Sequence, residues 1–470
     1  MTEEKKQNLN KLIFIIFEIF SVISCITCIL LIKVEEKQLL ALLPLGFAVI
    51  TLFFQKELMQ DNIIILIIDA LYFVRLSILP FLYSFNCDIQ LFEGKEYVSS
   101  YINKSCILML FEFLAIQITI YLHSHRKNND KIKVKYINIK ENISKFLIIG
   151  LSAYIIIVYC FMPQYAESFK TILNLSDADF TIAGDSIVYQ IGTIGRIIKT
   201  LFSMSFQIIR ILLPAYIIRS VCKKNASPKL AFAVLIVFCL LQFFFLTSTF
   251  AEAIVACLAI ILYYLHLFPS KKKKIIMLIG ISTIGIMIVY FAVRYFSKNS
   301  SIYDKSSGPI LYMAQIISAY FTGPDNVASL PNDLSIFNVD KSFGKEAFKA
   351  GIIGAIPFNS TLFGDRGNKL QYYYNIYNRA YGQIPPTIGA GYYYFGFILA
   401  PVISILFVKL SLVYYDKAQK INKSIKYISE IFCSITFALG TVMYSPSITL
   451  AWFFSWGIPM LILTSFTGEK

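Results

Sequence analysis

The segment NLNKLIFIIFEIFSVISCITCILLIK, residues 8–33, decides the fold class, because only one charged side chain, Glu18, lies between Lys11 and Lys33. A helix of about 20 apolar residues is long enough to cross the hydrocarbon core of a bilayer. The segment has no small-residue cleavage site of the kind that ends a signal peptide. We therefore expect it to form a first membrane-spanning helix.

Similar apolar runs recur along the whole chain of 470 residues, which is 57% hydrophobic and 15% charged with a mean hydropathy of +0.65. A soluble protein of this length cannot bury so much apolar surface. The pattern predicts an all-α, polytopic integral membrane protein. We expect about twelve transmembrane helices, at residues 12–33, 38–54, 62–85, 105–124, 146–163, 197–219, 230–247, 250–268, 275–296, 387–409, 428–444 and 448–466.

The loops between these predicted helices alternate in charge. Because lysine and arginine favour the cytoplasmic side of a membrane, the alternation predicts that both termini are cytoplasmic. It also accounts for the net charge of +15 without a nucleic-acid partner. The basic loops lie at residues 126–145, 219–224, 271–274 and 417–426, and the acidic ones at 35–36, 88–96 and 167–185.

One predicted outer loop, residues 297–386, is about 90 residues long, too long for a passive connection. It divides the chain into transmembrane helices at 1–296, the loop itself, and transmembrane helices at 387–470. Two stretches inside it, ILYMAQIISAYFTG (310–323) and FKAGIIGAIPF (348–358), are apolar but too short to span a bilayer. We expect both to form short amphipathic or re-entrant helices.

The sequence contains no phosphate-binding loop of the nucleotide type and no cluster of metal ligands, so it implies neither a cofactor nor a metal. The three histidines, His123, His125 and His266, all lie near predicted cytoplasmic helix ends. The nine cysteines lie largely inside apolar runs, which favours packing over redox chemistry.

Several charged residues interrupt the apolar runs, where an ionised group is costly unless it has a partner or faces a cavity. The sequence leaves open whether they pair between neighbouring helices or line a functional site. These residues are Glu18, Asp69, Arg75, Glu112 and Arg210.

Positive residues in and beside the outer loop break the orientation rule, which favours a ligand that attracts them. The alternative is that they snorkel to the interface or form a loop salt bridge such as Asp365–Arg366. Arginine binds phosphate with a two-pronged fork and stays charged when partly desolvated. In NRAYGQIPPTIGAGYYYFG, residues 378–396, the prolines predict a helix start whose glycines leave backbone N–H groups open to an anion. An aromatic belt with closely packed glycines is the alternative. The candidate substrate-binding residues are Arg294, Arg366, Arg379, Lys305, Tyr377, Tyr381, Gln383, Gly389, Arg210 and Arg196.

Two stretches, AYFTGPDNVA (319–328) and AYGQIPPTIGAGYYYFGFILAP (380–401), resemble Wzy-type polymerases of O-antigen and capsule repeat units. The layout of many spans with one long outer loop before the last three is similar as well. The resemblance implies a GT-C-like membrane fold and a metal-independent glycosyltransferase of the bacterial cytoplasmic membrane. It would transfer a growing glycan from undecaprenyl pyrophosphate onto the next lipid-linked repeat unit, with the bilayer and a chain-length regulator protein as partners.

The resemblance also suggests roles for individual residues. Arg366 and Arg379 match positions that commonly bind the pyrophosphate in this family. A base is needed for the acceptor hydroxyl, and Asp325 and Asp365 are the candidates. One departure is LTSTFAEAIV (246–255), which carries Glu252 where many relatives carry an arginine.

Two other functions remain open on the sequence. A lipid-linked oligosaccharide flippase would suit the number of spans, but such transporters usually show repeated halves and short loops. An O-antigen ligase resembles the polymerase, but ligases typically depend on an outer histidine, and none is expected here.

Overall fold

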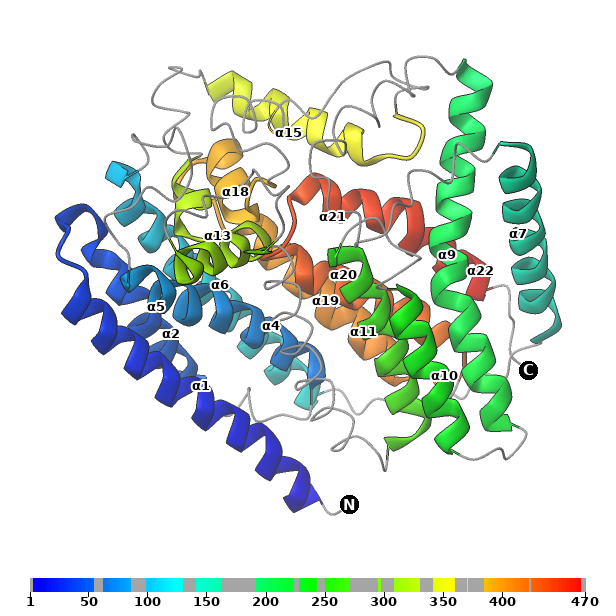
Figure 1. Ribbon diagram of the computed structural model, residues 1–470, viewed down its shortest axis with the longest axis horizontal. Helices are drawn as coiled ribbons and strands as arrows, with labels where there is room; N and C mark the ends of the chain where they lie inside the picture. The colour runs from blue at the N-terminus through cyan, green and yellow to red at the C-terminus, as the bar shows by residue number, and fades with distance from the viewer. Residues whose placement is uncertain are drawn as a thin grey trace.

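The computed structural model describes residues 3–54, 62–85, 99–129, 141–162, 192–223, 228–242, 250–269, 295–296, 308–329, 341–359, 370, 384–421 and 424–465. Within these ranges every regular element is helical, which confirms the all-α prediction (Figure 1). Five helices are long and apolar enough to cross a membrane: Lys11–Leu31, Ile63–Ser84, Tyr101–His125, Thr193–Cys222 and Pro446–Ser465. The chain is therefore suited to a membrane, while the number of twelve spans stays a prediction.

One half of the structure contains a row of neighbouring helices in the order α1, α2, α6 and α19, the last of which comes from the C-terminal part of the chain. Behind this row lies a second span that begins as α4, continues through the π-helix η2 and ends as α5. The bounds are α1 Glu3–Leu31, η1 Glu35–Ala41, α2 Leu42–Phe53, α4 Ile63–Phe73, η2 Val74–Ile78, α5 Leu79–Ser84, α6 Ser99–Asn129 and α19 Val402–Gln419.

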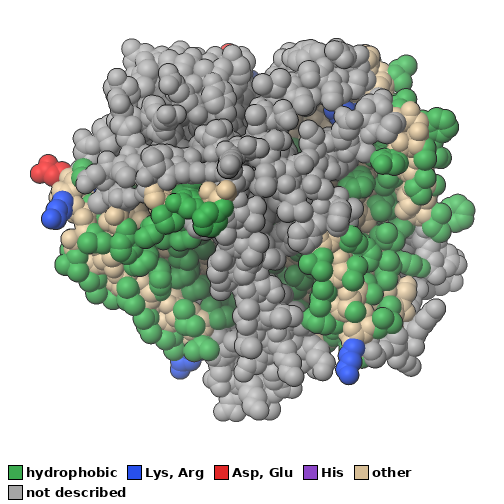
Figure 2. Space-filling model, viewed as in Figure 1, with side chains coloured by type: hydrophobic (Ala, Val, Ile, Leu, Met, Phe, Trp, Pro, Cys, Tyr) green, Lys and Arg blue, Asp and Glu red, His purple; other side chains and the backbone are tan. Residues whose placement is uncertain are grey.

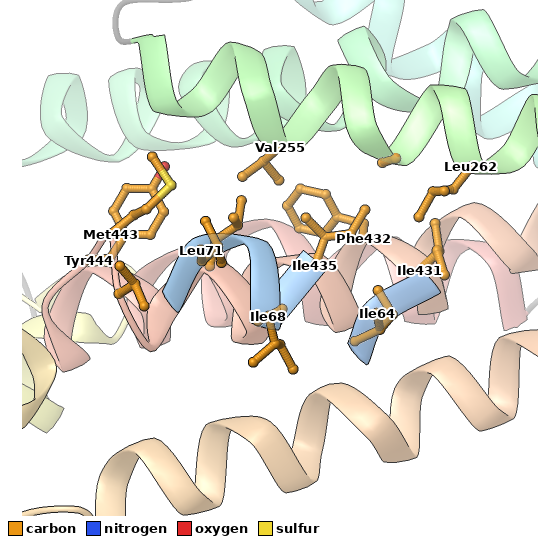
Figure 3. Packing of buried hydrophobic residues seen from close by; sticks show 14 of the residues in the cluster. Ile64, Ile68, Leu71, Val255, Leu262, Ile431, Phe432, Ile435, Met443 and Tyr444 are labelled. Atoms are coloured by element: carbon orange, nitrogen blue, oxygen red, sulfur yellow. The ribbon is translucent and has the colours of Figure 1, made fainter. Parts of the chain in front are cut away.

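The other half is built from α7, α9, α10 and α11, and α20 connects the two halves because it contacts α4, α11 and α19. Every residue of α20 from Tyr427 to Gly440 is buried. Figure 3 shows Ile431 and Ile435 of this helix between Ile64 and Ile68 of α4 and Leu262 of α11. The bounds are α7 Glu141–Phe161, α9 Thr193–Lys223, α10 Pro228–Leu241, α11 Phe250–Leu267, α20 Lys426–Gly440, α21 Pro446–Trp452, η7 Phe453–Gly457 and α22 Ile458–Ser465.

The outside of the described helices is apolar, as expected for a surface that meets lipid. In Figure 2 hydrophobic side chains cover the flanks of these helices, and the charged ones appear near the ends. Helix α1 illustrates this, since Ile16, Ile19, Ile26 and Leu30 are all more than half exposed.

Most of the predicted helical ranges coincide with helices, one is wrong, and one is not tested. The range 275–296 lies outside the described residues, apart from 295–296. The range 387–409 was predicted as one helix and is wrong, because α18 (Thr387–Phe395) ends at Gly396 before α19 begins at Val402. Gly396 has φ 79°, a left-handed conformation that glycine adopts at little cost and that stops the helix.

Helix ends that the charge pattern assigns to one side of the membrane do lie together. At one end Tyr83, which closes α5, reaches Asp325, and Lys104 near the start of α6 reaches Tyr392. At the other end His123, near the end of α6, lies 2.9 Å from Asp416, near the end of α19. The relative placement of the helix ends thus agrees with the alternation of charged loops.

The long loop contributes short helices, as predicted. Helix α13 spans Pro309–Phe321 and packs its apolar residues against α5, and α15 spans Lys341–Ala355 beside α18 and α21. After α13 the chain turns at Thr322, whose hydroxyl and carbonyl are both bonded inside the bundle. The turn after α13 is therefore buried inside the helix bundle, and a re-entrant path through the membrane stays a prediction.

Candidate functional site

The stretches AYFTGPDNVA (319–328) and AYGQIPPTIGAGYYYFGFILAP (380–401) meet at one segment, residues 440–444, which runs from the last residue of α20 toward α21. Thr322 of the first stretch donates its hydroxyl to the carbonyl of Val442 at 2.7 Å. The hydroxyl oxygen of Thr387 in the second lies 2.7 Å from the carbonyl oxygens of both Gly440 and Tyr444, and its one hydrogen can be donated to either. Stretches far apart in sequence are thus joined through buried hydrogen bonds, and we take their junction as the centre of the candidate site.

A buried ion pair contacts this junction through the carbonyl of Thr322. Arg75 is fully buried, and its Nη1 lies 2.7 Å from Oε2 of Glu112, which also accepts from Ser404 Oγ. Its Nε donates to the carbonyl of Thr322 at 2.9 Å, at the negative C-terminal end of α13. Its Nη2 has no hydrogen-bond partner in the described part of the chain. The sequence left open whether Arg75 and Glu112 pair between helices or line a functional site, and the structure shows that they pair.

The carboxylate of Asp325 is held in place by two hydroxyl donors. Its Oδ1 accepts from Tyr83 at 2.9 Å and from Ser318 at 2.7 Å, and the side chain is 2% exposed. Asn326 donates to the carbonyl of Ser318 at 2.9 Å and fixes the same turn. Oδ2 of Asp325 is buried and has no partner among the described residues, so one oxygen of an oriented carboxylate keeps its capacity to accept a hydrogen bond.

A second charged group, on α9 and α11, lies on the other side of residues 440–444. Arg210 and Glu252 approach to 3.6 Å, and Gln207 donates to Glu252 at 3.3 Å. The guanidinium carbon of Arg210 lies 5.9 Å from the ring centre of Trp456, within cation–π range. Glu252 of α11 therefore lies beside an arginine from another helix, α9.

Aromatic rings connect this group to the junction. The ring centres of Trp452 and Trp456 are 4.8 Å apart, and those of Tyr444 and Trp452 are 4.5 Å apart. Trp456 belongs to the π-helix η7, as Arg75 belongs to the π-helix η2. Such single-turn π-bulges frequently mark functional sites, because they shift side chains away from the regular helical positions.

The structure places only some of the predicted site residues. Arg210 and Asp325 lie on either side of the junction. Arg196 is partly exposed near the start of α9, fourteen residues or about 21 Å along the helix from Arg210, so these two do not share a site. The remaining candidates lie outside the described residues: Asp365, Arg294, Arg366, Arg379, Lys305, Tyr377, Tyr381 and Gln383.

One glycine of α18, Gly391, is required for close packing. A Cβ at Gly391 would collide with the carbonyl oxygen of Ala400, so this position tolerates no side chain. Gly389 is buried in the first turn of the same helix. Tyr392 accepts a hydrogen bond of 2.6 Å from Lys104, which anchors α18 to α6.

Sequence reasoning missed the residues that orient the candidates, namely Tyr83, Ser318, Thr322 and Tyr444. Tyr83 and Asp325 are separated by 242 positions, so no local pattern links them. The signal that was available is the motif TGPDN, in which the structure buries three polar residues, Thr322, Asp325 and Asn326.

Among the described residues, no group of three or more histidine, cysteine, aspartate or glutamate side chains is arranged to hold a metal ion. Comparisons with protein-family models, with curated proteins and with solved structures found no match to this chain.

Proposed function

We propose that the chain is a membrane glycosyltransferase of the Wzy type, which joins lipid-linked oligosaccharide repeat units on the outer face of the bacterial cytoplasmic membrane. The observation that supports this most directly is the junction at residues 440–444. Both stretches that carry the family resemblance bind that one segment, and Asp325, three residues after Thr322, has one buried carboxylate oxygen without a hydrogen-bond partner among the described residues.

In the proposed reaction Asp325 accepts the proton of the acceptor hydroxyl, whose oxygen attacks the anomeric carbon of the donor glycan. The bond from that carbon to the pyrophosphate oxygen breaks, and the lipid pyrophosphate leaves with inversion of the anomeric centre. Tyr83 and Ser318 orient the base by occupying its other oxygen. Arg366 and Arg379, which lie outside the described residues, are proposed to stabilise the charge on the leaving group.

A flippase for the same lipid-linked glycans is the second candidate, because ionisable side chains line the interior of the helix bundle. Besides the pairs at Arg75 and Arg210, Asp69 lies 2.7 Å from Gln117 between α4 and α6. Charged residues inside a bundle often mark a transport pathway. The described helices are compatible with either function.

Deleting the gene separates the two functions. Loss of a polymerase leaves single repeat units on the cell surface, since flipping and ligation continue. Loss of a flippase traps the unit on its lipid inside the cell. Surface glycan and extracted lipid-linked sugars would be analysed together, and a deletion strain without any single-unit surface product would overturn the polymerase proposal.

A further inference from the structure

One lysine, Lys409 of α19, lies on the apolar outer surface of the bundle, where lipid offers its positive charge no partner. Lys409 of α19 is exposed, and it lies on the same face of that helix as Val402 and Leu406, which are 45% and 50% exposed. The part of the chain that the structure describes offers it no hydrogen bond or ion pair. A cation in lipid is costly unless it reaches the interface or meets an opposite charge.

The depth of Lys409 follows from two contacts between α19 and α6. Ser404 bonds Glu112, and Asp416 bonds His123, so the two helices run parallel and in register. Lys409 follows Ser404 by five residues and is therefore level with Gln117, five residues after Glu112. That is roughly 12 Å along α6 from the end of its apolar span at His125. A lysine side chain is shorter than this distance, so snorkelling alone does not bring its charge to the interface.

A glutamate lies at the same depth as Lys409, on α1, at the opposite end of the row formed by α1, α2, α6 and α19. Glu18 of α1 is half-buried and accepts a hydrogen bond from Thr51 of α2, and no described residue offers it a positive charge. The rings of Phe47 and Phe113 stack with centres 5.2 Å apart, which sets the register of α2 against α6. Thr51 follows Phe47 by four residues and is therefore also level with Gln117.

The order of the helices makes this surface self-complementary. Helices α1, α2, α6 and α19 form one row, with Glu18 at one edge and Lys409 at the other. A two-fold axis along the membrane normal, through the middle of the row, sets α1 against α19 of a second copy and α2 against α6. Between the charged edges, α2 and α6 expose apolar residues such as Val49 and Ile118.

We propose that this face binds a second copy of the chain, and that Lys409 of each copy pairs with Glu18 of the other. The two pairs are equivalent by symmetry, as in an isologous interface. The proposal is independent of the glycosyltransferase reaction, because it involves neither Asp325 nor the junction at residues 440–444.

Charge reversal tests the pairing. Two differently tagged copies of the full chain are co-expressed, and the fraction that co-purifies in mild detergent is measured. Two wild-type copies should associate. Two copies of Lys409→Glu, or two of Glu18→Lys, set like charges together twice, and co-purification should fall by about tenfold or more. A Lys409→Glu copy with a Glu18→Lys copy restores both attractions and should associate like wild type.

If a charge-reversal variant does not accumulate in the membrane, crosslinking in intact membranes provides a second test. Cysteines replacing Glu18 in one tagged copy and Lys409 in the other should form an oxidative crosslink, whereas cysteines replacing Glu18 and Phe146, which is 82% exposed on α7, should not. The proposal is overturned if wild-type copies do not associate, if Lys409→Glu associates with itself as wild type does, or if the mixed pair fails to recover. Any of these results would leave Lys409 to a different protein.

Discussion

Arg75 and Glu112 form an ion pair of 2.7 Å in which neither side chain has any solvent exposure. The pair joins the π-helix η2 to α6, and through the carbonyl of Thr322 it also holds the turn after α13. Since that turn carries Thr322 and Asp325, the ion pair helps to fix the position of both residues in the candidate site.

Breaking this pair on one side should destabilise the protein strongly. Arg75→Met leaves the carboxylate of Glu112 buried without its cation, which costs about 3–5 kcal/mol. Replacing both partners, as Arg75→Met with Glu112→Leu, removes the unpaired charge and should recover much of that loss. The thermal unfolding midpoint in detergent measures both. If Glu112→Leu lowers the unfolding midpoint of Arg75→Met by as much as Arg75→Met lowered that of the wild type, the two residues contribute independently and the ion pair is not the source of the stability.

The contact between Gly391 and Ala400 predicts a second local effect. A methyl group at position 391 has no room against the backbone carbonyl of Ala400, so Gly391→Ala should cost about 1–3 kcal/mol through overpacking. Gly150 on α7 is the matched control, because a Cβ there meets no atom within 4 Å and alanine is the better helix former. Equal unfolding midpoints for the two variants would contradict the tight packing of α18 against residue 400.

The sequence was sufficient for most helices because an apolar run of about 20 residues is a strong signal. It was not sufficient at residues 387–409, where the apolar run continues through the break. The stop depends on the left-handed conformation of Gly396, which hydrophobicity does not report. For the site, the motif containing Asp325 was visible, but its partner Tyr83 lies 242 positions away and is brought to it only by the packing of α13 on α5.

The predicted orientation can be tested by thiol labelling on intact cells. Lys345 and Lys349 of α15 are exposed, as are His125 and Lys420 at the opposite helix ends. In a background without Cys87 and the exposed Cys160, cysteines at 345 and 349 should react with an impermeant reagent, whereas those at 125 and 420 should not. If the cysteine at 420 is labelled and the cysteine at 345 is not, the assignment of the two sides is reversed.

The role of Asp325 as a base predicts a specific loss of rate. Asp325→Asn keeps the size of the side chain and its acceptance from Tyr83 and Ser318, but removes its basicity, so polymerisation should slow by roughly 100-fold or more. Tyr83→Phe leaves the carboxylate in place and removes one orienting donor, so its effect should be smaller. Polymer length and the binding of lipid-linked donor are measured for both. Wild-type chain length from Asp325→Asn would exclude Asp325, and Asp365→Asn would then be tested.

The last prediction concerns Arg379, in the stretch that leads into α18. If both nitrogens of its fork bind the pyrophosphate, lysine cannot replace it, since a single ammonium does not supply two parallel hydrogen bonds. Losing a charge-assisted contact costs about 1.5–3 kcal/mol, roughly ten- to a hundredfold in rate. Arg379→Lys and Arg379→Ala should therefore both give short polymer at normal membrane levels. Arg196→Lys is the control, because that arginine is partly exposed and about 21 Å along α9 from Arg210, and lysine can take over an interfacial position. If Arg379→Lys makes polymer of full length, as the control should, Arg379 is an interfacial anchor and the pyrophosphate is bound elsewhere.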